Sequence, residues 1–329
     1  MRIKGQKVLV TGAGGFLGSH VCAALVQAGA DVTAMVRYSS RADWGNLEFL
    51  PAEERAALNV VAGNIEDGDL ISLHVKGKDV VFHLAALIAI PYSYEAPLSY
   101  VRTNIEGTLN VAEAARRSGS TRVVHTSTSE TYGTACYTPI DEAHPLKGQS
   151  PYSASKIGAD KLMESYHLSF GLPVVTVRPF NVFGPRQSAR AIIPTVISQA
   201  LVEDEVRLGA LDPVRDLTFA ADTARAFVLA AEREAAVGET INVGSGKGIS
   251  IGALAGTILS LIGGGKTVAL DPTRLRPKTS EVFELICDNR KAQELLGWSP
   301  QVSLEDGLRQ TIEFIRANPG LYRPGTYTR

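Results

Sequence analysis

The stretch KVLVTGAGGFLGSH, residues 7–20, joins a short apolar run to a glycine-rich turn and then to an amphipathic segment. Gly12, Gly15 and Gly18 follow the run KVLV, where a helix would begin. Glycine there tolerates positive φ and lets backbone amides approach an anion at the positive end of the helix dipole. The stretch therefore predicts a strand, a pyrophosphate-binding turn and a helix; a glycine-rich turn that binds nothing is the alternative.

The same alternation continues over the first half of the chain. The β-branched runs DVTAMV, LNVVAG, KDVVFHLA, TRVVHTS and PVVTVRP are interleaved with helical stretches, the longest over residues 97–117 and 152–169. Strands and helices by turns are typical of a parallel sheet covered by helices on both faces. We therefore expect an α/β fold with a Rossmann-like, doubly wound parallel sheet.

The regularity fades after residue 180. Helices are expected near residues 191–202, 220–233, 250–262 and 303–317, with short strands between them. We therefore expect a dinucleotide-binding domain over residues 1–180 and a smaller substrate-binding lobe mainly over 181–329, with about 210–245 able to return to the first domain. There is no fixed-period repeat or low-complexity linker, so we expect the lobes to pack together.

Composition limits the classes of function. The 329 residues are 45% hydrophobic and 20% charged, with a net charge of −1, which is typical of a soluble globular protein without a field for nucleic acid. The first apolar run is too short for a signal peptide or membrane span, so a cytoplasmic location is expected. Cys22, Cys136 and Cys287 lack zinc or disulfide spacing and are expected to be reduced and structural; no metal site is expected.

Tyr152 and Lys156, in SPYSASK, lie four residues apart on an expected helix that follows the strand TRVVHTS. Such a pair is common by chance, but this position makes it informative. Residues four apart share a helix face, and an ammonium nearby favours the phenolate. The spacing predicts that Lys156 lowers the pKa of Tyr152, so that the phenol can take a proton from a substrate hydroxyl while a hydride passes to a cofactor.

Arg37 bears on which dinucleotide is bound. Many dinucleotide folds place an acidic residue after the second strand to hold the ribose hydroxyls, whereas DVTAMV is followed by Arg37. A guanidinium there suits a 2′-phosphate, so NADP is favoured over NAD. The alternative is a solvated surface arginine.

Several further motifs carry a family resemblance: FHLAA, TNIEGTLNV, TSTSETYG, RPFNVFGPRQ, RDLTFAADTA and LGWSP. Together with the glycine-rich turn and SPYSASK, they make the chain resemble the extended short-chain dehydrogenase/reductases that modify nucleotide sugars, over essentially its full length. TSTSE and RPFNVFGPRQSARAIIPT look most like bacterial 4,6-dehydratases of NDP-N-acetylhexosamines, of the type found in legionaminic acid pathways. GDP-mannose 4,6-dehydratase is a more distant relative.

The resemblance implies further site residues and an assembly. A homodimer built on helices 97–117 and 152–169 is expected, and the aromatic segment IPYSYEAP should hang over the sugar or the nicotinamide. His83 is expected to be a packed core histidine. The implied cofactor contacts are Gly12, Gly15, Phe16, Leu17, Gly18, Arg37, Asn64, Ile65, Leu84, Ala85, Ala86, Asn104, Tyr152, Lys156 and Pro179. The implied nucleotide-sugar contacts are Asn181, Arg190, Arg215, Arg276 and Glu281; solvated loop arginines are the alternative.

Glu130 is the residue that a simple Tyr and Lys pair does not need. In a 4,6-dehydratase, oxidation at C4 acidifies the C5 hydrogen, and a carboxylate opposite can remove it. We assign that role to Glu130, the C4 oxygen contact to Thr128, and note that Ser129 stands where some relatives carry an aspartic acid proton donor. An exposed strand-end glutamate is the alternative.

Rival functions remain open. A 4-epimerase needs no base at C5, and a UDP-glucuronate decarboxylase would need a cation for the substrate carboxylate, which Arg190 or Arg186 could supply. A non-catalytic nucleotide-binding regulator is a remote third possibility.

Overall fold

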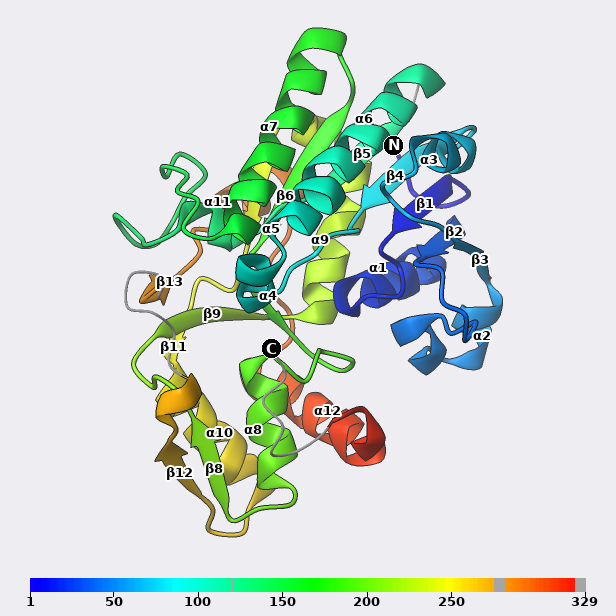
Figure 1. The fold of residues 1–329 in the computed structure, drawn as a ribbon. Coiled ribbons are helices and arrows are strands. Elements are labelled where there is room, and N and C mark those ends of the chain that lie inside the picture. Colours follow the sequence, from blue (N-terminus) through cyan, green and yellow to red (C-terminus); the bar gives the residue numbers. More distant parts are fainter. Residues whose placement is uncertain (120, 275–281, 323–329) are drawn as a thin grey trace.

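The computed structural model describes residues 1–119, 121–274 and 282–322 and consists of a larger and a smaller lobe (Figure 1). The larger lobe contains a seven-stranded sheet in the order β10-β6-β5-β4-β1-β2-β3, and all of its strand pairs are parallel. This confirms the expected Rossmann-like sheet. Its strands are β1 Lys7–Thr11, β2 Asp31–Val36, β3 Leu58–Ala62, β4 Val80–His83, β5 Arg122–Thr126, β6 Val174–Pro179 and β10 Thr240–Val243.

Helices cover both faces of this sheet. On one face α1 packs against α9, with α11 beside them; on the other, α3 packs against α6 and α6 against α7. Burial on both faces explains why strands such as β1 and β4 are continuous apolar runs. The covering helices are α1 Phe16–Gln27, α3 Gly68–Val75, α6 Gly107–Ser118, α7 Pro151–Phe170, α9 Ala220–Glu232 and α11 Arg290–Leu296, with the short α2 Ala52–Ala56 near α1.

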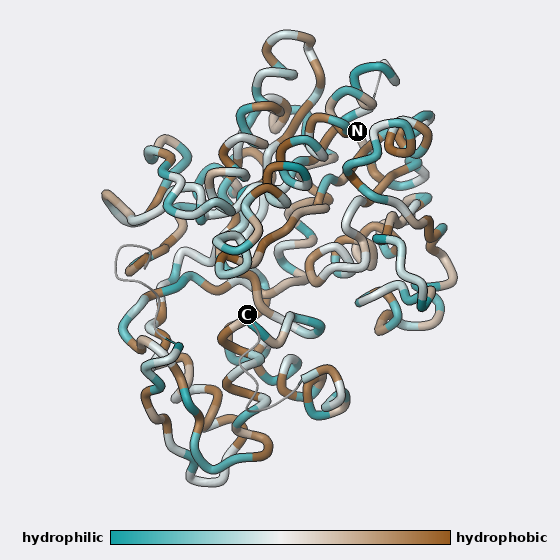
Figure 2. The backbone as a smooth tube through the Cα atoms, in the orientation of Figure 1, coloured by the Kyte–Doolittle hydropathy of each residue, from teal (hydrophilic) through white to brown (hydrophobic). Residues whose placement is uncertain are grey.

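The order of the strands places a binding crevice. The chain winds outward in one direction from β1 to β3 and in the other from β4 to β10, so the carboxyl ends of β1 and β4 lie at the switch point. Ligands of such sheets bind in the crevice outside these ends. Figure 2 shows apolar stretches along the centre of the larger lobe and hydrophilic ones along many of its outer turns.

Two expectations for residues 90–117 differ from the structure. The aromatic segment IPYSYE, for which we expected no helix, forms α4 Ile90–Glu95, and Pro91 suits its first turn because its missing N–H would have no partner there. The expected helix over 97–117 is divided into α5 Pro97–Tyr100, a π-helical turn Val101–Glu106 and α6. π-helical turns inside helices are rare and are frequent at functional sites, and this one carries Asn104.

The smaller lobe has a core of its own. Its helices α8 Ile192–Ala200, α10 Ile251–Ile262 and α12 Leu304–Ala317 pack together with short strands. Residues 220–243 supply α9 and β10 to the larger lobe. Residues 290–296 supply α11 to the same lobe, which we did not predict. The small-lobe strands are β7 Asn181–Phe183, β8 Glu205–Leu208, β9 Val214–Phe219, β11 Gly248–Ser250, β12 Thr267–Leu270 and β13 Glu284–Leu285.

The three cysteines are unbridged. Cys22 and Cys287 are buried, whereas Cys136 is exposed. Within residues 1–119, 121–274 and 282–322, no helix is long and apolar enough to cross a bilayer. In the same ranges, no three His, Cys, Asp or Glu side chains are grouped so that they could hold a metal ion.

Candidate active site

The glycine-rich turn closes tightly between β1 and α1. Gly12 has a φ of 71°, and a Cβ on it would lie 2.7 Å from the backbone nitrogen of Ala85. A Cβ on Gly18 would lie 2.1 Å from the carbonyl oxygen of Gly12. Gly15 is the N-cap of α1, and no side chain caps the helix. The turn therefore leaves the helix N-terminus open to an anion and fits the pyrophosphate of a dinucleotide.

The other residues assigned to the cofactor gather at the same edge of the sheet. Phe16 and Leu17 begin α1, and Arg37 is exposed directly after β2. The remaining positions follow the carboxyl ends of β3 and β4 or end β6: Asn64, Ile65, Leu84, Ala85, Ala86 and Pro179.

Asn104 is fully buried and its side chain is used within the protein. Its Oδ1 accepts a 2.8 Å hydrogen bond from the Leu87 amide, and its Nδ2 donates to the Leu87 carbonyl and to Ser155 Oγ, both at 2.9 Å. These bonds tie the loop after β4 to α7. Asn104 therefore supports the loop after β4, and its contact with a cofactor stays a prediction.

The prediction for His83 is confirmed. It is 2% exposed, and its ring nitrogens hydrogen-bond to Thr11 Oγ1 and Thr108 Oγ1, each at 2.9 Å. Thr11 Oγ1 also accepts a bond from the Ala85 amide. His83 thus connects the end of β1, through Thr11, with α6, through Thr108, below the crevice.

Tyr152 and Lys156 lie on α7 behind the end of β5. Tyr152 is 7% exposed and shares a hydrogen bond with the Thr128 side chain. The Lys156 ammonium is buried and donates a 2.6 Å bond to the carbonyl oxygen of Thr126. The Tyr152 ring also contacts the Tyr100 ring edge-on, at 6.2 Å between centroids. The two side chains share a helix face, as predicted, and are held in place by β5 and the turn after it.

The expected effect of Lys156 on Tyr152 is wrong for the protein by itself. Burial raises the pKa of Tyr152, and nearby Glu130 and Asp160 raise it further, whereas the Thr128 hydrogen bond opposes them. Burial also lowers the pKa of Lys156 to about 8. Desolvation disfavours both charged forms, and in this interior its effect exceeds the attraction that the spacing alone suggested.

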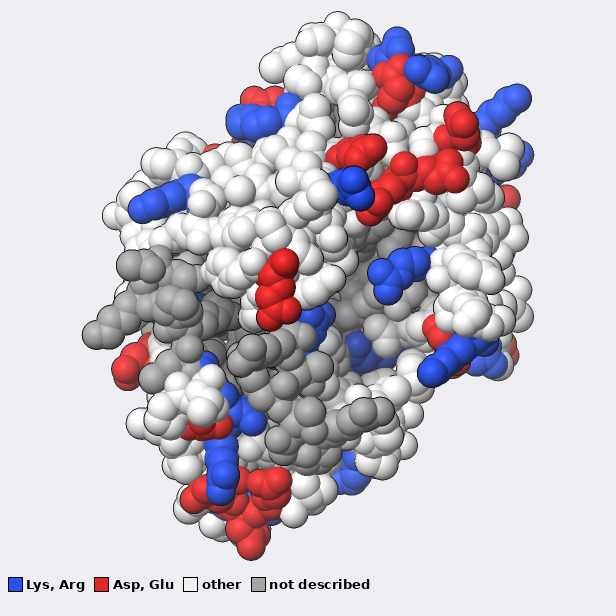
Figure 3. All heavy atoms as spheres, in the orientation of Figure 1, with Lys and Arg blue, Asp and Glu red and all other residues white. Residues whose placement is uncertain are grey.

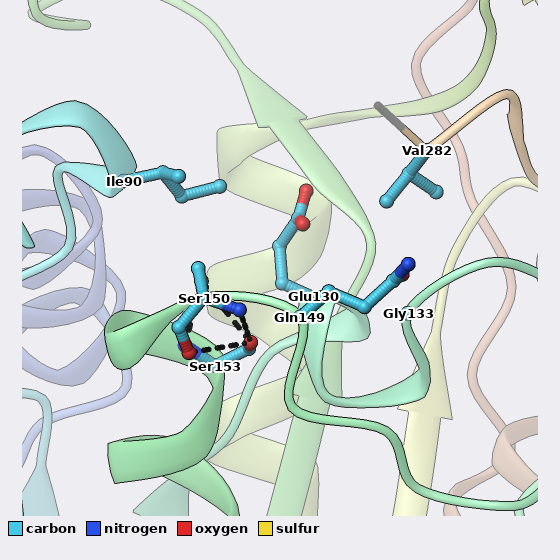
Figure 4. Close-up of a pocket in the computed structure, with 7 residues that line it drawn as sticks. All are labelled: Ile90, Glu130, Gly133, Gln149, Ser150, Ser153 and Val282. Atoms are coloured by element: carbon cyan, nitrogen blue, oxygen red, sulfur yellow. Dashed lines mark hydrogen bonds between the residues drawn. The ribbon is translucent and has the colours of Figure 1, made fainter. Parts of the chain in front are cut away.

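Glu130 lies in the turn that follows β5, next to Thr128. Thr128 is the N-cap of a 3-10 helix, Ser129–Tyr132, and its Oγ1 accepts the Glu130 amide at 3.3 Å. Figure 4 shows the Glu130 carboxylate directed into a pocket between Ile90 and Val282. The salt bridges of the described chain do not include Glu130. The Thr128 side chain therefore accepts the backbone amide of Glu130 and also bonds to the phenol of Tyr152, so it ties the turn after β5 to α7. The pocket is lined by Ile90, Glu130, Gly133, Gln149, Ser150, Ser153 and Val282.

Ser129 does not share this position. Its side chain is 3% exposed, and it is absent from the residues that line the pocket in the described structure. A serine hydroxyl is in addition a poor acid. A role of Ser129 as proton donor stays a prediction.

A buried charge network, which the sequence analysis missed, lies behind Lys156. Asp160 accepts hydrogen bonds from Ser127 Oγ at 2.6 Å, Arg178 at 2.8 Å and His125 Nε2 at 3.1 Å. Arg178 also donates to Tyr132 Oη at 2.8 Å. The sequence could have indicated Asp160, because Tyr152, Lys156 and Asp160 are spaced four residues apart and so share one helix face.

The residues assigned to the nucleotide sugar are less completely placed. Asn181 begins β7, and its Oδ1 is buried without a hydrogen-bond partner in the described chain. Arg215 lies in β9, is 9% exposed and donates to the Val214 carbonyl. Arg190 is exposed just before α8, with its Nε 3.3 Å from Ser188 Oγ. Arg276 and Glu281 lie outside the described residues.

Arg186 bears on the decarboxylase alternative. One guanidinium nitrogen lies 2.9 Å from His20 Nδ1, on the helix that carries the glycine-rich turn. Its backbone has a φ of 71°, which is unfavourable for a residue with a Cβ. Arg186 thus joins the small-lobe loop to α1, whereas Arg190 remains exposed. Figure 3 shows Lys and Arg side chains gathered at the hollow between the lobes, where a diphosphate would find cations.

Comparison with known proteins gives the family. The family model for GDP-mannose 4,6 dehydratase matches residues 9–311. A UDP-glucose 4-epimerase of Mycolicibacterium smegmatis is 35% identical over 94% of this chain and 99% of its own. A dTDP-glucose 4,6-dehydratase structure from Streptomyces venezuelae with NAD bound is 31% identical, covers 96% of this chain and 99% of its own, and has a TM-score of 0.85.

A third relative acts on an N-acetylated sugar. The structure of a UDP-N-acetylglucosamine 4-epimerase from Methanobrevibacter ruminantium, in complex with UDP-N-acetylmuramic acid, is 31% identical and has a TM-score of 0.86, over 96% of this chain and 99% of that one. Epimerases and dehydratases thus match this chain to a similar degree. The chain belongs to the GDP-mannose 4,6 dehydratase family of nucleotide-sugar dehydratases and epimerases.

Proposed function

We propose that the protein is an NDP-sugar 4,6-dehydratase, which converts an NDP-hexose or NDP-N-acetylhexosamine into a 4-keto-6-deoxy sugar. The observation that carries this is the carboxylate of Glu130, directed into the pocket next to Thr128 and Tyr152. A 4-epimerase removes no proton from C5 and therefore needs no second base. A 4,6-dehydratase removes the C5 proton and requires such a base.

The chain's own residues divide the work as follows. Thr128 and Tyr152 bind the C4 hydroxyl, and Tyr152 takes its proton. A bound nicotinamide dinucleotide supplies the hydride acceptor for C4, the donor for C6, and a positive ring that favours the phenolate. Lys156, in its ammonium form, stabilises the same phenolate. Glu130 removes the C5 proton once C4 is a ketone, because the ketone stabilises the carbanion that forms.

Elimination at C6 requires a proton for the departing hydroxyl. Ser129 is buried and its hydroxyl is a poor acid, so we assign this proton to Glu130, which has just received one from C5. The carboxylate that leaves the step is again ready to act as a base. One residue thereby serves both halves of the elimination, in which the C5 proton and the C6 hydroxyl leave together as water. Return of the hydride to C6 gives an enolate, and a proton from water then restores the hydrogen at C5, while Tyr152 releases to solvent the proton that it took from the C4 hydroxyl.

We infer that the sugar is an N-acetylhexosamine, on the resemblance of TSTSE and RPFNVFGPRQSARAIIPT to dehydratases of that class. The neighbour that is complexed with an N-acetylated nucleotide sugar supports the same inference. Arg190 and Arg215 are proposed for the diphosphate, with Asn181 beside the sugar, since a buried amide oxygen without a partner can accept from a sugar hydroxyl.

A 4-epimerase is the second candidate, because a UDP-glucose 4-epimerase is among the most similar relatives. Mass spectrometry of NDP-sugars incubated with the protein and either NAD or NADP separates the functions. A dehydratase product is lighter by one water, an epimerase product has unchanged mass, and a decarboxylase product has lost carbon dioxide. Unchanged mass with an altered sugar configuration would move the protein to the epimerases.

We further propose a homodimer. Side chains that expose apolar surface lie on or next to α6 and α7: Val101 is 47% exposed, Leu109 39%, Leu168 75% and Phe170 58%. Burying such surface between two copies is favourable because it removes apolar area from water. Sedimentation equilibrium should give twice the chain mass of 35.1 kDa, and a single-chain mass at micromolar concentration would refute the dimer.

A further inference from the structure

Asp160 lies one helical turn beyond Lys156 on α7, and the residue is 6% exposed. Residues four apart on a helix have their Cβ atoms about 5–6 Å from each other. Asp160 makes no direct bond to Lys156, because its oxygens are taken by His125, Ser127 and Arg178. Its influence on the ammonium is therefore electrostatic and acts through a poorly solvated interior.

The other groups around Lys156 cannot replace this anion. From β4 and β5, His83 and His125 face it, and burial lowers the pKa of each, so both are neutral at physiological pH. From the end of β5 comes the Thr126 carbonyl, which is polar but uncharged. On α7 itself, Tyr152 is protonated because burial raises its pKa. Among the described residues, Asp160 is the group whose charge raises the pKa of Lys156 against burial.

Arg178 explains why the carboxylate stays ionised. It comes from β6, is 3% exposed, and donates to Asp160 at 2.8 Å, while a second guanidinium nitrogen bonds to Tyr132. Hydrogen bonding and the positive charge of Arg178 hold the pKa of Asp160 well below its usual range. A carboxylate with bonds from three residues, on β5, directly after it and on β6, is also fixed in position, since moving it would break all of them.

We propose that Asp160 is a positioning residue of the active site, whose fixed carboxylate keeps Lys156 in its ammonium form behind Tyr152. The catalytic consequence of Asp160 rests on the proposed function, because only a reaction that uses the Tyr152 phenolate needs the Lys156 ammonium. The effect of Asp160 on the charge of Lys156 does not depend on the proposed function. The two can therefore be tested separately.

The first test follows Lys156 directly and needs no substrate. The full-length protein is labelled with carbon-13 lysine, and the side-chain signals are followed by NMR as the pH changes; the Lys156 signal is the one lost in Lys156→Met. In the unaltered protein it should titrate near pH 8. In Asp160→Asn the midpoint should fall by about one to two pH units, as expected for the loss of a charge about 6 Å away. An unchanged midpoint would overturn the proposal.

Two further variants keep this test decisive. Ser127→Ala removes one hydrogen bond from Asp160 but no charge, so the midpoint should stay in place; a fall equal to that of Asp160→Asn would show that loosening, not charge, is responsible. If Asp160→Asn does not fold, Asp160→Asn combined with Arg178→Met removes the buried charge pair together, a change that proteins often tolerate. The midpoint should again fall.

The second test applies to turnover. In Asp160→Asn, the alkaline limb of the kcat profile should move to lower pH by the same amount as the Lys156 midpoint. A lower kcat with an unmoved limb would make Asp160 merely structural. If no NDP-sugar is dehydrated but the NMR midpoint still shifts, the proposed function fails while the role of Asp160 stands.

Discussion

Lys156 donates a 2.6 Å hydrogen bond to the carbonyl oxygen of Thr126, although burial lowers its pKa to about 8. The bond anchors the ammonium at the end of β5, beneath the turn that carries Thr128 and Glu130. A buried cation placed in this way costs stability at neutral pH, and the fold retains it. The buried ammonium of Lys156 thus indicates a functional requirement, because an uncharged Met at position 156 would be easier to bury.

This cost predicts a pH-dependent stability difference. The pKa of Lys156 is lower in the folded protein, about 8, than the ordinary 10.5, so the unfolded chain binds more protons between these values. Folding stability from this group therefore rises with pH through that window. At pH 7, Lys156→Met should gain up to about 3 kcal/mol from the removed penalty, less about 1 kcal/mol for the lost hydrogen bond.

Urea unfolding at pH 7 and pH 10 measures this effect. The difference in unfolding free energy between Lys156→Met and the unaltered protein should shrink or reverse at the higher pH, while Lys156→Met loses cofactor reduction. Equal differences at both pH values would contradict the lowered pKa.

Glu130→Gln should separate oxidation from elimination. Because the amide cannot accept the C5 proton, dehydration should fall by about 10²-fold or more, whereas partial reduction of the cofactor by the C4 hydroxyl should persist. Absorbance of the reduced nicotinamide and product mass report the two steps. Glu294→Gln, at an exposed position on α11, is the matched control and should behave like the unaltered enzyme. Full dehydratase turnover by Glu130→Gln would falsify the assignment.

Gly18→Ala should disturb the phosphate turn. The new Cβ would lie 2.1 Å from the Gly12 carbonyl oxygen, so backbone must shift and the amides can no longer converge on a pyrophosphate. Cofactor affinity, measured by calorimetry, should fall at least about tenfold, which corresponds to about 1.4 kcal/mol. Gly256→Ala, in α10 with no atom within 4 Å of the new Cβ, should bind the cofactor normally and be slightly more stable. Unaltered affinity in Gly18→Ala would remove this turn from the cofactor site.

Arg37→Ala tests the choice of dinucleotide. Arg37 is exposed just beyond β2, and a charge-assisted contact of its guanidinium with a 2′-phosphate would contribute about 1.5–3 kcal/mol. The variant should therefore lose about tenfold or more in NADP affinity and little in NAD affinity. Arg41→Ala, a nearby exposed arginine, is the control. NAD binding at least as tight as NADP binding by the unaltered protein would remove this role for Arg37 before any substitution is made.

The local sequence by itself determined the phosphate turn, the Tyr152 and Lys156 pair and the order of strands and helices in this protein. The spacing of Gly12, Gly15 and Gly18 after KVLV and the four-residue spacing of Tyr152 and Lys156 act through backbone geometry within one turn or one helix face. Strand and helix alternation likewise follows from burial on both faces of a parallel sheet. Such features are readable because the interacting residues are neighbours in the chain.

The tertiary structure decided what those residues experience. The direction of the Tyr152 pKa shift, the burial of Ser129, the support by Asn104 and the charge network of Asp160 with Arg178 depend on which elements are packed around them. Arg178 and Asp160 meet only because β6 lies beside β5 and α7 covers both. Desolvation depends on this whole surrounding and not on residue spacing, so it appears only when the chain is folded.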